Sequence, residues 1–311
     1  MHCNNQIRTI CRVVHENRAP EISTVNLTVD IQQRRIIFMK TIKYLTVFCM
    51  MICMIMQLNI NVSANENNIC YVAHRGYTKY APENSIPAFE AAGKEGFQAV
   101  ECDIHETAKD KKGKRRFVIM HDQTLNRMCG LSGKNIYQKK LTYQKIRNKY
   151  YIKTGNNIES YTKKQLRIPS LEEYLNICKR YHMKPVIEIK QKMKKDTIKR
   201  LYQSLKKAKM QNQAVVTCKY KQQLTYMRKY ARKMPLEYVR HDFTQNDLSW
   251  MKKYHINVSI NKNILSDDMI QLFERNNIKI NIWTINNKDQ LYNFTNKGIK
   301  IVTSDDALWK E

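Results

Sequence analysis

Short apolar runs alternate with helix-like stretches from about residue 70 to the end of the chain. The strand-like runs are 70–74, 98–104, 116–121, 185–190, 214–218, 236–240, 257–260, 279–284 and 299–303. Between most of them the apolar residues recur every three or four positions; Ile198, Leu201 and Leu205, for example, share one helix face. Repeated strand–helix units predict parallel strands joined by crossover helices, which is an α/β fold.

Nine runs are one more than an eight-stranded barrel needs. The link between runs 98–104 and 116–121 is too short for a crossover helix and carries the turn-like segment 109–113. We therefore expect 116–121 to return as an antiparallel hairpin arm. The predicted fold is a TIM (β/α)8 barrel with a β-hairpin arm after the second strand. Asn84 and Ser266 stand where helix N-caps belong, and the polar stretch 123–169 is expected to be a long loop on the functional face.

A second pattern precedes the barrel. A basic start at Met39 is followed by an apolar run, 44–58, and by a small-residue segment that ends at Ala64. This order predicts a signal peptide over 39–64 with cleavage after Ala64. The apolar run is short for a membrane span, which needs roughly 20 residues; an uncleaved N-terminal membrane anchor is the alternative. Residues 1–38 are expected to be a non-native or disordered extension, and 65–311 the folded domain.

Composition and charge add two expectations. The formal net charge is +28, and the Lys and Arg residues are spread along the whole chain. Solvated helix faces explain such charge, and attraction to an anionic membrane or to cell-wall phosphate polymers is the functional alternative. No basic motif interleaved with aromatic residues is present, so no nucleic acid partner is expected. The five cysteines after Ala64 are odd in number and lack a CxxC motif, which indicates neither a disulfide scaffold nor a zinc site.

Polar side chains at the ends of the apolar runs carry the candidate chemistry, because strand ends face the active-site mouth of a barrel. His74 and His121 each follow an apolar run, and two such histidines suit an acid–base pair. Arg75 offers a planar fork that matches phosphate oxygens.

Carboxylates occupy two further strand ends. Glu101 and Asp103 lie on the same side of their strand because successive side chains alternate. Two adjacent buried carboxylates are costly without a cation, and Ca²⁺ or Mg²⁺ is the natural compensation. Glu188 could supply a third ligand, while Lys190 on the same face could neutralise a phosphate. Each signal alone is more often structural; their joint occurrence in this order favours a catalytic site.

Together these residues resemble the glycerophosphodiester phosphodiesterase family over about residues 70–308. The motifs that carry the resemblance are Ala73-His74-Arg75-Gly76, Ala81-Pro82-Glu83-Asn84-Ser85, Glu101-Cys102-Asp103, His121-Asp122 with Leu125 and Arg127, Glu188-Ile189-Lys190, Trp283-Thr284-Ile285-Asn286 and Thr303-Ser304-Asp305. The resemblance implies a TIM barrel of the phospholipase-C-like phosphodiesterase type. It also implies hydrolysis of small glycerophosphodiesters to an alcohol and sn-glycerol 3-phosphate.

The resemblance also implies roles for single residues. His74 and His121 would be the catalytic pair, and Arg75 and Lys190 would contact the phosphate. The implied ligands of a divalent cation, with Ca²⁺ expected before Mg²⁺, are Glu101, Asp103 and Glu188.

The remaining motif residues have weaker assignments. Glu83 and Asn84 match the Pro-Glu-Asn element of the family, which implies a supporting role. Trp283 either packs against the glycerol moiety or belongs to the core. Ser85 stands where Thr is usual and keeps a hydroxyl at a helix start. The usual Pro is missing after Asp305, so no role is assigned to Asp305.

Two other functions fit parts of the pattern. One is a phospholipase-C-like lyase that stops at a cyclic product and needs no metal. The other is a catalytically inert barrel that binds anionic phosphate polymers. Retention of all three carboxylates disfavours the first, and the complete set of two histidines and three carboxylates disfavours the second. The expected location is outside the cell or at the outer face of its membrane.

Overall fold

The computed structural model describes residues 34–46, 48 and 69–310. The chain divides into two units, one before and one after residue 66. In the first unit, residues 34–46 form a helix whose apolar side chains, among them Phe38 and Leu45, are exposed. Among the described residues, none of the helices is both long and apolar enough to cross a bilayer. The predicted cleavage after Ala64 lies outside the described residues, so the signal peptide stays a prediction.

The second unit is a closed barrel of alternating strands and helices. Its strands are β1 (Cys70–Ala73), β2 (Ala99–Glu106), β3 (Phe117–Ile119), β4 (Lys184–Ile189), β5 (Val215–Cys218), β6 (Leu236–Arg240), β7 (Asn257–Asn261), β8 (Ile280–Trp283) and β9 (Ile301–Ser304). Its α-helices are α2 (Ile86–Glu95), α3 (Tyr143–Lys149), α4 (Leu171–Arg180), α5 (Lys195–Lys207), α6 (Lys221–Tyr230), α7 (Gln245–Tyr254), α8 (Asp267–Arg275) and α9 (Lys288–Asn296).

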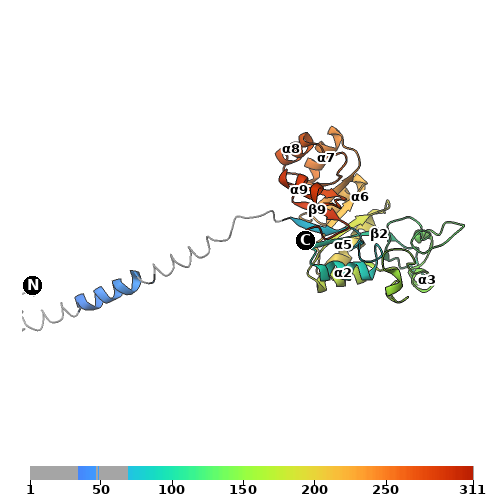
Figure 1. Ribbon diagram of the computed structural model, residues 1–311, viewed down its shortest axis with the longest axis horizontal. Helices are drawn as coiled ribbons and strands as arrows, with labels where there is room; N and C mark the ends of the chain where they lie inside the picture. The colour runs from blue at the N-terminus through green and yellow to red at the C-terminus, as the bar shows by residue number, and fades with distance from the viewer. Residues whose placement is uncertain (1–33, 47, 49–68, 311) are drawn as a thin grey trace, which may run out of the picture. The chain divides into compact units, whose positions relative to one another are not determined.

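The strand order closes the sheet on itself. Parallel pairing runs from β1 through β9, β8, β7, β6, β5 and β4 to β2, and β1 also pairs with β2. The end of the described chain lies beside β1 (Figure 1). There Trp309 packs on Tyr71 of β1 with ring centroids 4.5 Å apart. The predicted TIM barrel is confirmed.

The predicted hairpin arm is also confirmed. β3 pairs antiparallel with the end of β2, with Ile104 opposite Ile119. β4 pairs with β2 only as far as Ile104. On the other edge of β2, β1 pairs only as far as Val100, so the rest of that edge is free to pair with β3.

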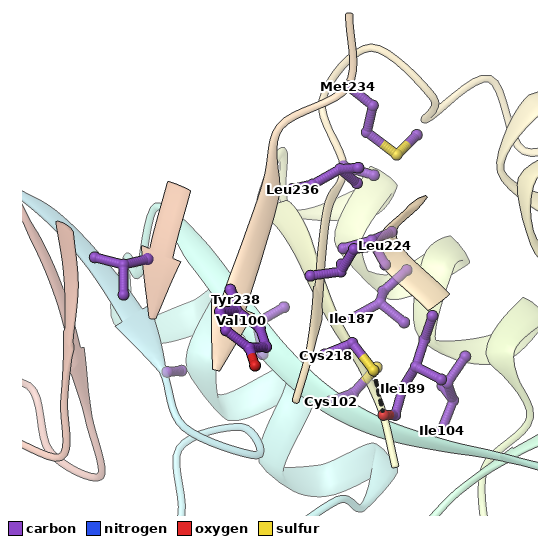
Figure 2. Close-up of a cluster of buried hydrophobic side chains, with 14 of the residues drawn as sticks. Val100, Cys102, Ile104, Ile187, Ile189, Cys218, Leu224, Met234, Leu236 and Tyr238 are labelled. Carbon is purple, nitrogen blue, oxygen red and sulfur yellow. Dashed lines mark hydrogen bonds between the residues drawn. The ribbon is translucent and has the colours of Figure 1, made fainter. Parts of the chain in front are cut away.

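Alternation along the strands separates the core from the site. Val100, Cys102 and Ile104 point outward into the layer between strands and helices, where they meet Ile187 and Ile189 of β4 (Figure 2). The residues between them must point into the barrel because neighbouring side chains alternate.

Two smaller expectations need correction. The stretch 123–169 is more than a loop: it contains α3 and two short 3₁₀ helices, η1 (Gln138–Lys140) and η2 (Ile158–Ser160), and a core cluster of its own around Leu125, Ile146 and Ile152. Asn84 does not cap a helix; Ser85 caps α2 instead, and Asn84 points into the barrel mouth. Ser266 caps α8 as predicted.

The opposite, N-terminal end of the barrel buries an acidic side chain. Glu237 on β6 is 4% exposed, and its Oε2 accepts a hydrogen bond from Asn281 Nδ2 at 3.0 Å. Asn281 is itself held by Thr303, whose hydroxyl donates to Asn281 Oδ1. Burial raises the pKa of Glu237 to about 7, against the lowering effect of the Asn281 hydrogen bond.

This burial predicts a pH-dependent stability. Between about pH 4.5 and 7 the folded chain holds the Glu237 proton that the unfolded chain has lost, so the free energy of unfolding falls as pH rises. Glu237→Gln keeps the acceptor without the charge. We expect it to match the wild type at pH 5 and to be more stable by about 1–3 kcal/mol at pH 8.

Urea unfolding at the two pH values measures the effect. Glu274→Gln is the matched control, because Glu274 is exposed and lines the same end of the barrel. An equal effect of Glu237→Gln at pH 5 and pH 8 would contradict the prediction.

Candidate active site

A cavity of about 550 Å³ opens where the parallel strands end. Seven residues that the sequence singled out line it: His74, Arg75, Glu101, His121, Glu188, Lys190 and Trp283. They come from β1, β2, β4 and β8 and from the residue pair after β3. Residues far apart in sequence meet here because parallel strands all end on the same rim of a barrel.

Three carboxylates cluster at the base of this cavity. Glu101 and Asp103 project from β2, and Glu188 projects from the neighbouring strand opposite Asp103. One oxygen of each lies within 4.8 Å of the others. Lys190 Nζ lies between two of them, 3.0 Å from Glu188 Oε1 and 3.3 Å from Asp103 Oδ1.

The pKa values of two of these carboxyl groups, Glu101 and Asp103, are shifted in opposite directions. Burial raises the pKa of Glu101 well above its ordinary value, and the charges of Asp103 and Glu188 add to the rise. Burial also raises the pKa of Asp103, but Lys190 and Arg75 outweigh it and bring the value to about 2. The neighbouring cations therefore favour the charged form of Asp103, whereas burial disfavours the charged form of Glu101 unless a further cation lies beside it.

The carboxylate cluster fits a hard divalent cation. Its donors are all carboxylate oxygens, which Ca²⁺ and Mg²⁺ prefer. Glu101 Oε1 is buried and has no hydrogen-bond partner among the described residues. An unpaired buried oxygen is expensive, and a cation held by Glu101, Asp103 and Glu188 would satisfy it.

A tight backbone turn after β1 supports the cluster. Arg75 has a positive φ of 57°, and its N–H donates to Glu101 Oε2 at 2.9 Å. Its guanidinium donates to Glu83 Oε2 at 3.1 Å. Asn84 is the last residue of the Pro-Glu-Asn motif. Its Nδ2 donates a hydrogen bond to Asp103 Oδ2 at 2.8 Å, and its Oδ1 accepts one from the Asp103 backbone N–H at 3.1 Å. Glu83 and Asn84 therefore lie behind the site and hold the residues that face it.

Each histidine is held by its own aspartate. His74 Nδ1 lies 2.8 Å from Asp305 Oδ1. Asp305 also accepts hydrogen bonds from Thr78 at 2.9 Å and from Asn286 at 2.7 Å. Burial raises the pKa of Asp305, but the hydrogen bond from His74 and the other donors outweigh it and lower the pKa to about 2. Asp305, to which the sequence assigned no role, fixes the ring of His74.

His121 has the same kind of partner. Its Nδ1 lies 2.8 Å from Asp122 Oδ1. Arg127 holds the other side of this aspartate, with its Nε 2.7 Å from Asp122 Oδ2, and the Arg127 hydrogen bonds lower the Asp122 pKa to about 2. Arg127 also donates to Glu83 at 2.7 Å. The two aspartates therefore orient both imidazole rings through the same nitrogen, Nδ1.

Two polar residues that line the cavity were not singled out from the sequence. Lys219 and His241 line the cavity, and the His241 ring packs edge-on against Trp283 with centroids 4.8 Å apart. Both residues directly follow a strand, β5 and β6, so the strand-end argument that found His74 would have found them too. Trp283 lines the cavity and its Nε1 is buried without a partner among the described residues.

Comparison with known proteins identifies the class. Residues 74–308 match the model of the glycerophosphoryl diester phosphodiesterase family. YhdW of Bacillus subtilis is 27% identical over 75% of this chain and 93% of its own length. A glycerophosphodiester phosphodiesterase of Caldanaerobacter subterraneus is 22% identical over 76% of this chain and 93% of its own length.

Solved structures show the same fold. A phosphodiesterase from Oleispira antarctica, in complex with the product sn-glycerol-3-phosphate, has a TM-score of 0.66 at 20% identity and covers 76% of this chain and 92% of its own. A glycerophosphodiester phosphodiesterase from Thermotoga maritima has a TM-score of 0.59 at 20% identity, with 78% and 96% covered. The chain belongs to the glycerophosphoryl diester phosphodiesterase family and is a phosphoric diester hydrolase.

The carboxylate cluster predicts that a divalent cation stabilises the fold. At a Ca²⁺ concentration about 100 times its Kd, the free energy of unfolding should rise by about 2.7 kcal/mol. Glu101→Gln should lose most of this gain because it removes one anionic ligand. Thermal unfolding with and without Ca²⁺ measures it, and Glu159→Gln, on an exposed residue outside the cluster, is the control. An unchanged gain in Glu101→Gln would rule out Glu101 as a ligand.

Proposed function

We propose that this enzyme hydrolyses glycerophosphodiesters to an alcohol and sn-glycerol 3-phosphate, with His74 and His121 as its acid–base pair. The observation that carries the proposal is that both histidines, each oriented by an aspartate, line the same cavity as the carboxylate cluster. The product sn-glycerol-3-phosphate in the Oleispira antarctica relative supports the substrate class.

The cation would be held by Glu101, Asp103 and Glu188, and Ca²⁺ is proposed before Mg²⁺. Bound there, it would supply a Lewis acid for a phosphate oxygen and a glycerol hydroxyl. Arg75 and Lys190 line the same cavity and would add positive charge for the phosphate. Fixed charges at the developing oxyanion are worth more in a cavity than in water.

The two histidines would move the protons. Each Nδ1 is hydrogen-bonded to an aspartate. Each Nε2 is therefore the ring nitrogen that can exchange a proton with the substrate. One histidine removes the proton of the glycerol hydroxyl as its oxygen attacks phosphorus, and the other protonates the departing alcohol oxygen. Water then opens the cyclic phosphate with the two roles exchanged. The rings are preoriented, so little reorganisation is needed at either step.

Removing one histidine tests the acid–base assignment. His121→Asn should lower kcat for glycerophosphocholine by about 10²–10⁴-fold, the usual contribution of a positioned acid or base. His182→Asn is the matched control, because His182 is exposed, lies outside the cavity and has a positive φ of 56° that Asn tolerates. Release of glycerol 3-phosphate measures turnover.

The same assay separates the proposal from its rivals. Excess chelator should abolish turnover, and added Ca²⁺ should restore it. A cyclic product formed in chelator would indicate a metal-free lyase, and no turnover under any condition would indicate an inert binder. Normal turnover by His121→Asn would show that the acid–base pair is wrongly assigned.

Asp305 should act as a positioning residue. Asp305→Asn removes the charge that holds His74 and should lower kcat by about 10- to 10⁴-fold, the upper figure being that of a carboxylate that orients a catalytic histidine. KM should change little, because Asp305 would not contact the substrate.

The neighbouring carboxylate provides the control for this variant. Asp306 forms an ion pair with Lys79 and accepts a hydrogen bond from Tyr77, and it contacts neither catalytic histidine by a hydrogen bond. Asp306→Asn should therefore retain kcat. If Asp305→Asn and Asp306→Asn lowered kcat and the melting temperature equally, Asp305 would be structural only.

A further inference from the structure

A second and larger cavity of about 1230 Å³ lies beside the active site. One wall is the β2–β3 hairpin with its turn, and another is η1. The loop after β4 and one face of α5 complete it. On α5, Arg200, Ser204 and Lys207 face this cavity, while Ile198, Leu201 and Leu205 pack into the core. We call this cavity the basic groove.

The basic groove concentrates positive charge. Ten of its lining residues are Lys or Arg, and only Glu106, Glu172 and Asp196 are acidic. The active-site cavity, in contrast, is lined by three Lys or Arg and three acidic residues, so its charges balance. The positive excess therefore lies in the groove and not in the active-site cavity.

Most of this charge is free to meet a ligand. Within residues 69–310, seven groove lysines are exposed and have no carboxylate at ion-pair distance: Lys109, Lys114, Lys139, Lys140, Lys192, Lys194 and Lys207. Two of the three acidic groove residues form ion pairs with arginines, Glu106 with Arg200 and Glu172 with Arg116, and only Asp196 is left as a local counter-charge. Like charges held close together without counter-charges repel each other, and an anionic ligand would relieve the repulsion.

The basic groove is continuous with the active site. Gln123 lines both cavities. At two further places, neighbouring residues in the chain line one cavity each. Lys190 lines the active site and Gln191 lines the groove. In the same way, Lys219 lines the active site and Tyr220 lines the groove. His105 lies at the floor of the groove, and its Nε2 is 3.4 Å from the backbone oxygen of His121. A ligand that reaches along the groove therefore ends at the proposed catalytic histidine.

The shape of the groove favours a chain over a membrane. A membrane-binding face presents exposed apolar side chains that insert among the lipids. In the groove, Phe117 and Met193 are buried, and the exposed side chains of the lining are polar or charged. A concave trench with charged walls fits an extended polyanion, whose phosphates can meet lysines on both sides.

We propose that the basic groove binds the continuation of a polyanionic substrate, a chain of glycerol phosphate units whose terminal diester lies in the active site. The inference rests on the proposed function, because it names the substrate class of that site. Each unit beyond the terminal one carries a phosphate for the groove lysines, whereas a small glycerophosphodiester reaches none of them.

Neutralising the groove lysines tests the inference. The variant Lys139→Gln, Lys140→Gln, Lys192→Gln, Lys194→Gln removes four charges from two walls of the groove. The ratio of KM for a glycerol phosphate oligomer to KM for glycerophosphocholine should rise about tenfold, because four surface ion pairs worth about twofold each multiply to a factor on the order of ten. The rise should shrink at high salt because exposed charges are screened.

A matched control separates local from overall charge. Lys229→Gln, Lys233→Gln, Lys252→Gln, Lys288→Gln removes the same four charges from exposed positions outside both cavities and should leave the ratio unchanged. An equal rise in both variants, or no rise in either, would overturn the inference. So would a groove variant that lost binding to phosphatidylglycerol vesicles but kept its oligomer KM, because the groove would then serve a membrane.

Binding without turnover keeps the inference apart from the proposed function. Retardation of the oligomer in native gels, in the presence of chelator, needs no catalysis. If the wild type hydrolysed no diester yet retarded the oligomer more than the groove variant did, the proposed function would fail and the groove would stand. If it hydrolysed glycerophosphocholine but both variants retarded the oligomer equally, only the groove inference would fail.

Discussion

The structure depends on how the barrel mouth accommodates buried negative charge. Asp103 is almost fully buried, yet it remains anionic because Asn84, Lys190 and Arg75 surround it. Removing Lys190 or Arg75 would leave this buried charge only partly compensated, and breaking a buried ion pair costs several kcal/mol. The turn after β1 and the end of β4 are therefore tied to β2 by one carboxylate, and the same contacts bring Glu101 and Glu188 to it.

The two histidines extend this arrangement outward. Asp305 follows the last strand and Asp122 follows the hairpin arm, so the residues that orient the two rings come from segments far apart in the sequence. Closure of β9 against β1 places Asp305 beside His74. The antiparallel return of β3 along β2 brings His121 and Asp122 back to the same rim. Barrel closure and the hairpin arm are thus conditions for the site as well as features of the fold.

Charge is distributed differently in the barrel mouth and in the basic groove. Inside the mouth, acidic and basic groups balance because each buried charge needs a partner. In the basic groove the lysines are exposed, where solvation lets unpaired charge persist. The hairpin arm forms a wall of the groove and supplies His121 to the mouth, so the element that departs from a simple eight-stranded barrel is the one that joins both regions.

The sequence by itself determined the barrel, the hairpin arm and the set of residues at the strand ends. Apolar periodicity reports which side chains are buried, and alternation on β2 separates Glu101 and Asp103 from the core. Only the tertiary structure decided that Asp305 holds His74, that Asn84 supports Asp103 and does not cap a helix, and that lysines from four separate segments gather in one groove. Periodicity is a local property, whereas these contacts join residues that meet only when the barrel closes.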